Sequence, residues 1–373
     1  MSGVSSRNFG LDLLRAIAIG LVIFSHCSFL LADHSDNLIL NIVRSFGAIG
    51  VDLFFVLSGY LIGGILIKYL SSGRTSFKDL LIFWKRRWLR TLPNYFLILI
   101  INIIVFSLLG NSLFNEIWLY VPFLQNLSSP HPDFFTEAWS LSIEEYAYLL
   151  LPFCLFLILS ITRTIKVKRI FIIVTFSFIL LLFLLKLNYY VNYELHSYKQ
   201  WSMTFRKVVI YRLDAIYFGF ILVYITKSFP AVISKLKNVL FVLGIILFAV
   251  SHFAIYFYEM WPQTWPAFYV FWYLQIVVTS LGLMFPLITT LRTKKWLNAL
   301  VYYVSTRSYA IYLINYSLVL LVIQHFTNVS DLNSLGKVFI ILGYLCSTLI
   351  LSELLYVYFE RPILKFRDKK YIR

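Results

Sequence analysis

The chain has 373 residues, of which 60% are hydrophobic and only 13% are charged. So few charged side chains could not cover the surface of a water-soluble protein of this length, and apolar runs of about 20 residues, long enough to cross a bilayer, recur along the sequence. The net charge of +16 lies mainly in short connectors between these runs, so no basic nucleic-acid-binding face is expected.

The apolar runs predict an all-α integral membrane bundle of about ten spanning helices. The predicted spans are 11–32, 39–67, 91–109, 139–161, 170–187, 205–226, 239–258, 267–290, 297–324 and 338–360. No polar stretch between them is long enough for a soluble domain, so residues 1–373 are predicted to form a single membrane domain.

The connectors alternate in charge. Lys and Arg concentrate in the connectors at 68–90, 163–169, 227–237 and 292–295 and in the tail 361–373, whereas the opposite connectors carry Asp33, Asp36, Glu116, Asp133, Glu137, Glu194, Glu259 and Asp331. Because basic connectors stay on the cytoplasmic side, this alternation predicts that both termini are cytoplasmic and that the number of spans is even.

The first span carries Arg15 and His26, eleven residues and about three helical turns apart, which puts them on one face of the helix with about 16 Å between them. An ionisable group within a span is costly unless it is paired or faces water. A site that holds an anionic donor at one end and performs base chemistry at the other would use these two residues. Alternatively, both are interface residues.

The second span contains the segment Gly50–Tyr60, which places Asp52 near the middle of the bilayer. A carboxylate at that depth needs a cationic partner, and the candidates are Arg15, Arg44 and Arg212. The glycines predict close approach of another helix or a ligand. The pair could be functional or purely structural.

The fourth span opens with Glu144 and Glu145, which follow the long outer connector 111–137. Neighbours on a helix point about 100° apart, so the two acids cannot face the same cavity. One of them could orient the imidazole of His26, as carboxylates do for histidine bases, or it could pair with a nearby cation.

Spans six and nine are also polar. Span six holds Arg206, Lys207, Arg212 and Asp214, a charge density that only a polar interior tolerates. In span nine, Ser308, Tyr312 and Asn315 follow helical spacing along one stripe, which is a candidate site surface or ordinary packing.

Taken together, these motifs resemble the acyltransferase 3 family of polytopic membrane O-acyltransferases. The resemblance is carried, in order along nearly the whole chain, by Arg15 with His26, by Gly50–Tyr60, by Arg87-Trp-Leu-Arg90, by Trp139–Tyr146, by Arg212-Leu-Asp214, by Ser308–Tyr312 and by Glu360-Arg-Pro362. At Asn315 the family usually has histidine, which leaves the role of this position open.

The resemblance implies an enzyme of the bacterial inner membrane that moves an acyl group, often acetyl, from cytoplasmic acyl-CoA to a hydroxyl of an extracytoplasmic or lipid-linked glycan. It implies neither a bound cofactor nor a metal. His26 is the predicted base, acting either directly on the acceptor or through an acyl-histidine, and Glu144 is its predicted support. The predicted substrate-binding residues are Arg15, Asp52, Arg86, Arg87, Arg90, Arg212, Asp214, Tyr312 and Asn315, of which Arg86, Arg87 and Arg90 would attract the CoA phosphates.

Two other functions compete with acyl transfer. A transporter or glycan flippase would also place charges inside a helical bundle, and thioester cleavage that depends on His26 would distinguish them. A non-catalytic scaffold would leave the intramembrane charges without a purpose. Because the sequence ends soon after the tenth span, the bundle is expected to acylate its acceptor without an appended relay domain.

Overall fold

The structure is a computed structural model that describes residues 7–32, 37–162 and 166–371. Ten of its helices are long and apolar enough to cross a membrane, which confirms the predicted count and the all-α class. The elements are α1 (Phe9–Ser28), α2 (Leu38–Ser71), α3 (Phe77–Leu108), η1 (Asn115–Tyr120), α4 (Ala138–Ile161), α5 (Val167–Asn192), α6 (Tyr198–Trp201), η2 (Ser202–Arg206), α7 (Val209–Arg212), α8 (Asp214–Ser228), α9 (Pro230–Phe257), η3 (Phe268–Trp272), α10 (Tyr273–Ile288), α11 (Lys295–Ile314), η4 (Asn315–Leu320), α12 (Leu321–Phe326), η5 (Val329–Asp331), α13 (Ser334–Leu354), η6 (Leu355–Glu360) and α14 (Arg361–Tyr371).

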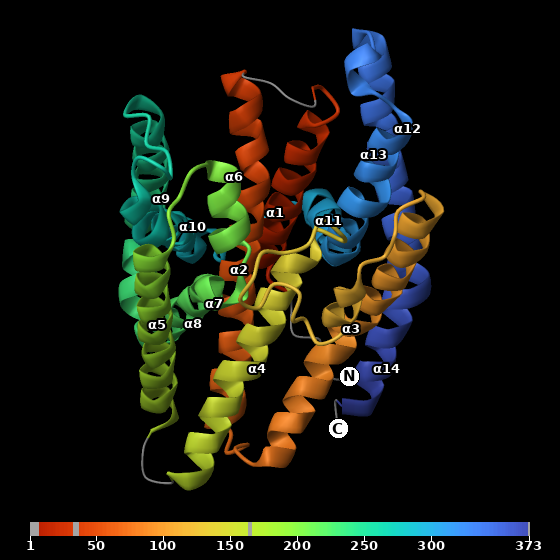
Figure 1. Cartoon of the computed structure of the whole chain (residues 1–373). Coiled ribbons are helices and arrows are strands. Elements are labelled where there is room, and N and C mark those ends of the chain that lie inside the picture. The colour runs from red at the N-terminus through yellow and green to blue at the C-terminus, as the bar shows by residue number, and fades with distance from the viewer. Residues whose placement is uncertain (1–6, 33–36, 163–165, 372–373) are drawn as a thin grey trace.

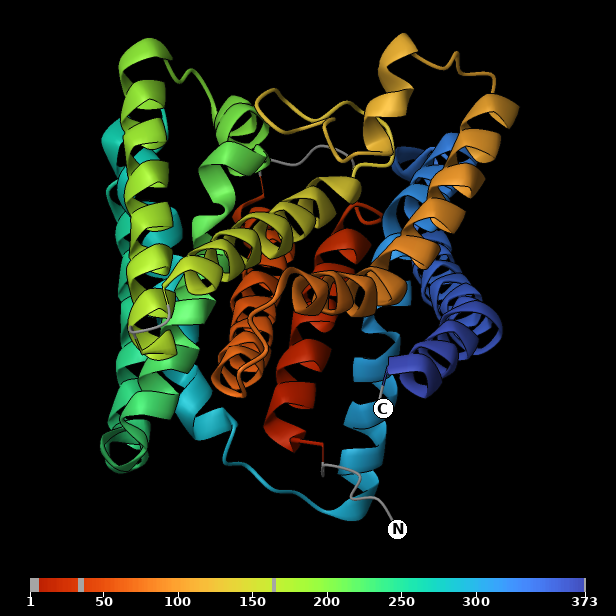
Figure 2. The same cartoon turned by 90° about the horizontal axis from the view of Figure 1, so that it is seen from below.

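The two termini lie on the same side of the bundle, as an even number of crossings requires (Figures 1 and 2). Helices α1 and α2 pack against each other, and α2 also packs along α8. Helix α9 lies at the edge, where it packs on α10 and buries only Gly244. The connector acids Asp33 and Asp36 and the basic residue Arg163 fall outside the described residues.

Helix α3 begins at Phe77, so the prediction that the third span starts at residue 91 was wrong. The helix starts at a capping box in which the backbone N–H of Asp79 donates to the Ser76 hydroxyl (3.3 Å) and the backbone N–H of Ser76 donates to the Asp79 carboxylate (3.1 Å). Most of the basic connector is therefore helical. Two of its arginines, Arg87 and Arg90, are tolerated because they face a polar interior.

The sixth predicted span is not continuous. A π-helical turn ends at Arg206, two non-helical residues follow, and the short α7 precedes α8. At the break, the backbone N–H of Val209 donates to the carbonyl of Asn126 in the long outer connector (2.9 Å). Asn126 is fully buried, so this connector is folded into the bundle, where irregular backbone finds protein partners instead of lipid.

Two glycines set the distance between α2 and α8. A Cβ atom added at Gly59 would lie 2.0 Å from the carbonyl oxygen of Ile216, and one added at Gly219 would lie 2.4 Å from that of Val56. The obstructing atoms are backbone and cannot move aside cheaply. The close approach of these helices therefore depends on both glycines.

Replacing Gly59 with alanine should destabilise the bundle by about 1–3 kcal/mol, because the added methyl group forces α2 and α8 apart. A thermal unfolding midpoint in detergent measures the loss. Gly20→Ala in α1 is the matched control, since nothing lies within 4 Å of a Cβ at that position, and its stability should equal or slightly exceed that of the wild type. Equal midpoints for the two variants would contradict this packing account.

Candidate active site

A cavity of about 200 Å³ lies at the centre of the bundle, between α1, α2, α3, α4 and α11. Five of the predicted site residues line it: Arg15, Arg87, Arg90, Glu144 and Tyr312. Its other polar lining residues are Ser58, Thr91, Ser140, Ser308 and Tyr309. We call this space the central cavity.

Arg87 and Glu144 form an ion pair in the wall of the central cavity. A guanidinium nitrogen of Arg87 lies 3.0 Å from the Glu144 carboxylate, and the guanidinium stacks over the Tyr148 ring at 4.2 Å. The hydroxyls of Ser58 (3.1 Å) and Tyr148 (2.9 Å) also donate to Glu144. The carboxylate thus holds Arg87 in a fixed orientation toward the cavity.

This arrangement differs from the predicted partnership of Glu144 with His26. Among the described residues, the partners of Glu144 are those in the cavity wall, and none of them is His26. The competing alternative, in which the acid pairs with a nearby cation, is what the structure shows. Residue spacing alone could place both Glu144 and His26 inside the bundle. The packing of α4 against α3 makes Arg87, and not His26, the partner of Glu144.

Arg15 is held at the same cavity by a second acid. Its guanidinium lies 2.9 Å from Asp12, which is 3% exposed and also accepts from the Ser305 hydroxyl (2.7 Å) and from Arg7 (3.1 Å). Asp12 lies one helical turn before Arg15, so both are presented on the same face of α1. Arg15 is therefore paired and partly buried, and is not a snorkelling interface residue.

The other two predicted arginines of α3 differ in orientation. Arg90 is an exposed side chain that lines the central cavity, and it lies one turn beyond Arg87. Arg86 is half-buried and points about 100° away from Arg87 around the helix. The motif Glu360-Arg-Pro362 also contacts α3, because the Asn94 amide donates to the Glu360 carboxylate (2.9 Å).

His26 forms a dyad with Asn315. The imidazole Nδ1 lies 2.5 Å from the amide oxygen of Asn315, whose amide nitrogen donates to the carbonyls of Ile311 (2.8 Å) and Tyr312 (2.9 Å). Because both amide hydrogens are committed to the helix backbone, the oxygen faces His26 and can only accept. Nδ1 therefore carries the proton, and Nε2 keeps a lone pair that can take another.

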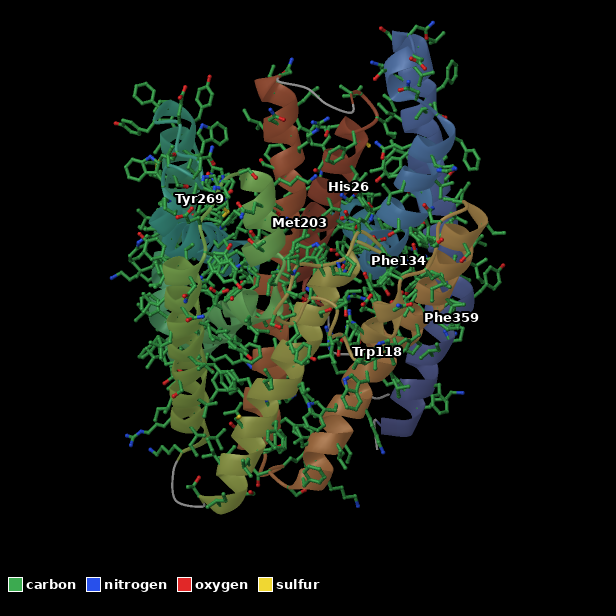
Figure 3. The ribbon with its side chains drawn as sticks, viewed as in Figure 1. His26, Trp118, Phe134, Met203, Tyr269 and Phe359 are labelled. Atoms are coloured by element: carbon green, nitrogen blue, oxygen red, sulfur yellow. The ribbon has the colours of Figure 1, made fainter. Side chains whose placement is uncertain are left out.

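His26 lies in the upper half of the bundle in Figure 3, and its partner Asn315 follows Tyr312, a residue of the central cavity, on the same chain segment. Tyr312 lines that cavity and precedes Asn315 by three residues, which is about 4.5 Å along the helix. Its hydroxyl hydrogen-bonds with that of Ser140 across the cavity end (2.8 Å). At Asn315 the helix becomes π-helical, a distortion common at functional sites.

The remaining predicted residues form a buried ionic network of their own. Arg212 has no exposed surface and pairs with both Asp52 and Asp214. Asp214 also accepts from Lys186 and Gln275. Of the three candidate partners of Asp52, the structure selects Arg212, and the network joins α2, α5, α8 and α10.

The folded outer connector contains a buried histidine and contacts a lysine at the break between η2 and α7, where the Asn126 amide donates to the Lys207 carbonyl (2.7 Å). The His131 side chain is 3% exposed; its Nδ1 hydrogen-bonds to the Pro132 carbonyl (2.7 Å), and burial lowers the pKa of His131 to about 3. Burial and the neighbouring Arg206 lower the pKa of Lys207 to about 8. This connector is thus a packed part of the bundle.

Comparison with known proteins decides the family. A family model described as an acyltransferase domain matches residues 8–357. The chain belongs to this acyltransferase family. It is therefore an enzyme, and its ten apolar helices make it an integral membrane protein of a bacterial membrane.

Two named relatives match part of the acyltransferase. The O-acetyltransferase OatA of Staphylococcus aureus (strain NCTC 8325 / PS 47) is 36% identical over 166 residues, which cover 38% of this chain and 24% of the relative. The peptidoglycan O-acetyltransferase OatA of Listeria monocytogenes is 32% identical over 159 residues, 38% of this chain and 23% of the relative. The matched region is thus about a quarter of each relative. No solved structure matches the acyltransferase.

Several residues of these networks were missed by sequence reasoning. Lys186 is the clearest case, because a lysine within an apolar span is itself a signal of a buried partner. Asp12 precedes Arg15 at helical spacing and could have been paired with it. Glu137 is buried and accepts from the backbone N–H of Ser317 (3.2 Å) and from the Ser317 hydroxyl. No local sequence pattern predicts this contact, because the two residues are far apart in the chain.

The buried His131 makes the stability of the acyltransferase depend on pH. The unfolded chain protonates this histidine near pH 6.5, whereas the folded chain does so only near pH 3. Between these values the unfolded state binds more protons, so stability is full above pH 6.5 and falls by about 1.4 kcal/mol per pH unit below it. At pH 5 the loss is about 2 kcal/mol.

His131→Asn keeps a donor for the Pro132 carbonyl and removes the titration, so the variant should lose less stability than the wild type between pH 7 and pH 5. Unfolding midpoints at the two pH values measure the difference. The exposed His196→Asn is the control and should behave as the wild type. If His131→Asn and the wild type showed the same acid sensitivity, His131 would not be the titrating group.

Proposed function

We propose that this single membrane-embedded domain transfers an acyl group, acetyl in the simplest case, from cytoplasmic acyl-CoA to a hydroxyl of an extracytoplasmic glycan. Peptidoglycan, which the name of the Listeria relative specifies, is the proposed acceptor. The observation that carries the proposal is the arrangement of a cationic cavity and a histidine with an available Nε2 in one bundle, where Tyr312 at the cavity precedes Asn315 at the histidine by one helical turn. The side that bears the termini is the proposed cytoplasmic side, because basic residues concentrate there.

The donor would bind through arginines. Arg15 and Arg87 are fixed by Asp12 and Glu144, and Arg90 is exposed in the cavity. Guanidinium groups bind phosphates through paired hydrogen bonds, and CoA carries several phosphates. The central cavity, at about 200 Å³, suits the thioester end of the donor. We assign the CoA phosphates to Arg90 and to Arg86, which lies closer to the side that bears the termini.

The chemical step would use His26. Nε2 removes the proton of the acceptor hydroxyl, the oxygen forms a bond to the thioester carbonyl carbon, and the carbon–sulfur bond breaks so that the CoA thiolate leaves and takes the proton from the imidazolium. Transfer in two steps through an acyl-histidine balances equally. In both versions Asn315 fixes the tautomer of His26, as an asparagine does in Cys-His-Asn sites.

The other site residues have supporting roles in this proposal. Tyr312 and Ser140 stand between the central cavity and His26, so the thioester passes or displaces their hydrogen bond. Glu144 positions Arg87 for the donor. Asp52, Arg212 and Asp214 hold α2, which forms one wall of the central cavity, against α8.

His26→Gln should lower acyl transfer by about 10²-fold or more, because the base is lost. Asn315→Ala should lower kcat while leaving the KM for the donor nearly unchanged, and Asn315→Asp, which keeps the acceptor oxygen, should restore most of the activity. Transfer of radiolabelled acetyl from acetyl-CoA to glycan in nanodiscs measures all three. His252→Gln in α9 is the control with activity unchanged. Full activity in His26→Gln would rule out the proposed base.

Arg90→Ala should raise the donor KM about tenfold with a small change in kcat, because one phosphate contact of about 1.4 kcal/mol is lost. The KM of the variant should also respond less to added salt than that of the wild type. Arg169→Ala, an exposed arginine on α5, is the control and should change neither value. An unaltered KM in Arg90→Ala would show that the donor does not reach the central cavity from this side.

A further inference from the structure

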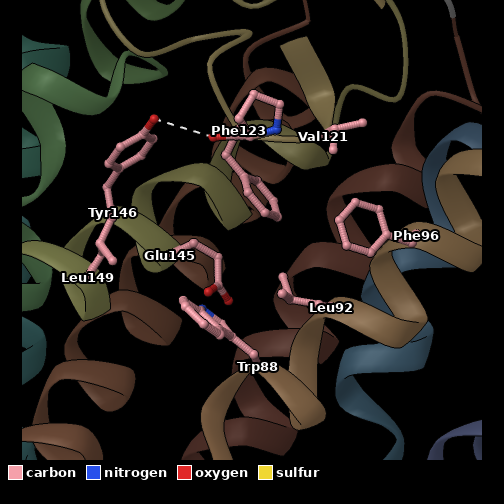
Figure 4. Close-up of a pocket in the computed structure, with 9 residues that line it drawn as sticks. Trp88, Leu92, Phe96, Val121, Phe123, Glu145, Tyr146 and Leu149 are labelled. Carbon is pink, nitrogen blue, oxygen red and sulfur yellow. Dashed lines mark hydrogen bonds between the residues drawn. The ribbon is translucent and has the colours of Figure 1, made fainter. Parts of the chain in front are cut away.

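A second pocket of about 220 Å³ lies between α3 and α4, beneath the outer connector (Figure 4). We call it the lateral pocket. Its walls are mainly aromatic and aliphatic, and its lining residues are Trp88, Leu92, Phe96, Val121, Pro122, Phe123, Glu145, Tyr146 and Leu149. The Tyr146 hydroxyl donates to the Pro122 carbonyl (3.3 Å), which ties the connector to α4 as a roof. The proposed acyl transfer uses none of these residues.

One carboxyl group projects into this apolar space. The Glu145 side chain is 8% exposed, and one of its oxygens accepts from the Thr91 hydroxyl (2.8 Å). The other oxygen, Oε2, makes no well-aligned hydrogen bond among the described residues, and the Trp88 indole N–H beside the carboxyl group is only a weak donor to it. The carboxyl group lies at the pocket between Trp88 and Leu92 (Figure 4). A buried acceptor left unsatisfied costs about 1–3 kcal/mol, so Oε2 favours a ligand that donates a hydrogen bond.

The surroundings of the lateral pocket indicate where such a ligand comes from. Apolar side chains beside it on both membrane-spanning helices are exposed, including Ile100 on α3 (54%) and Phe153 on α4 (43%). Val121 at the roof is 58% exposed. In a membrane these side chains contact acyl chains, so a ligand would reach the pocket from the bilayer and would itself be largely apolar.

The head group of that ligand is constrained by charge. A carboxylate would be repelled by Glu145. An ammonium group would add a cation beside Arg87, which already acts electrostatically on Glu145. A hydroxyl is the neutral donor that satisfies Oε2 without bringing a new charge into the apolar site. Thr91 also lines the central cavity, so this head group would lie one side chain away from that cavity.

We propose that the lateral pocket binds a membrane-borne aliphatic alcohol, with its chain against Trp88, Leu92 and Phe96 and its hydroxyl donating to Glu145 Oε2. The site is separate from the proposed donor and histidine sites, and its occupancy does not depend on acyl transfer. The enzyme would thus have a binding site that a ligand reaches from the bilayer, in addition to the central cavity.

Photo-crosslinking with decanol that carries a chain diazirine, in nanodiscs, tests this proposal. Mass spectrometry should locate the label on α3, on α4 or on the connector that roofs the pocket. Leu92→Trp fills the pocket and should lower this labelling about tenfold, whereas Leu157→Trp on the exposed face of α4 should not change it. Glu145→Ala should also lower it about tenfold, the loss of one hydrogen bond to a charged group.

Probes with other head groups decide the role of the hydroxyl even if Glu145→Ala does not fold. In the wild type, the matching diazirine alkane and the decanoate and decylamine probes should label the pocket about tenfold less than the alcohol. Equal labelling by the alkane, stronger labelling by the amine, or alcohol labelling that persists in Leu92→Trp would overturn the proposal. Size-exclusion profiles and acetyl-CoA cleavage report separately on folding and on the proposed function.

Discussion

The bundle depends on the pairing of charged side chains inside membrane-spanning helices. Arg212 has no exposed surface and lies between Asp52 and Asp214, and Lys186 completes the group. An unpaired charge at this depth is costly, while a paired one holds its helices in a specific arrangement. Asp52 reaches Arg212, and Asp214 reaches Arg212, Lys186 and Gln275, so the two acids favour one arrangement of α2, α5, α8 and α10.

The same constraint explains the form of the central cavity. Arg15 and Arg87 are each paired with an acid, Asp12 on the same helix and Glu144 on α4 in the cavity wall. Their guanidinium groups are therefore oriented before any donor arrives, which reduces the cost of ordering them on binding. Arg90 remains exposed at the cavity, where it can exchange water for a donor phosphate.

The cavity wall and the histidine dyad are linked along one helix. Tyr312 lines the central cavity and hydrogen-bonds with Ser140, and one helical turn further on Asn315 accepts from the Nδ1 of His26. The π-helical stretch that starts at Asn315 rotates the following residues relative to a regular helix, which brings Ser317 to the buried Glu137. In the proposed mechanism, the donor and acceptor sides meet at this short segment of α11 and η4.

The sequence was informative about which residues matter and less so about their partners. Hydropathy and basic connectors predicted ten spans, and the cost of intramembrane charge pointed to Arg15, Asp52 and Arg212, whereas the family resemblance pointed to Arg87. Which side chains become partners depends on the tilt of the helices and on breaks such as the one after Arg206. The hydrophobic periodicity of the sequence does not reveal either feature. For this reason Glu144 was expected beside His26, and Asn315, whose amide occupies that place, was expected only to bind substrate.

Some of the missing information was nevertheless local. The Ser76 and Asp79 spacing is a capping box that marks the true start of α3, and Lys186 stood out in an apolar span. The burial of the outer connector could not be read in this way, because its contacts with the break after Arg206 are between backbone groups of distant segments.

The central claim is that donor and acceptor reach this bundle from opposite sides and meet at His26. Proteoliposomes with the enzyme in one known orientation test it directly, with radiolabelled acetyl-CoA supplied on one side and a soluble glycan acceptor on the other. The account predicts acetyl ester only when the donor is on the side that bears the termini and the acceptor is opposite. Ester formed equally well with both substrates on the same side would contradict it.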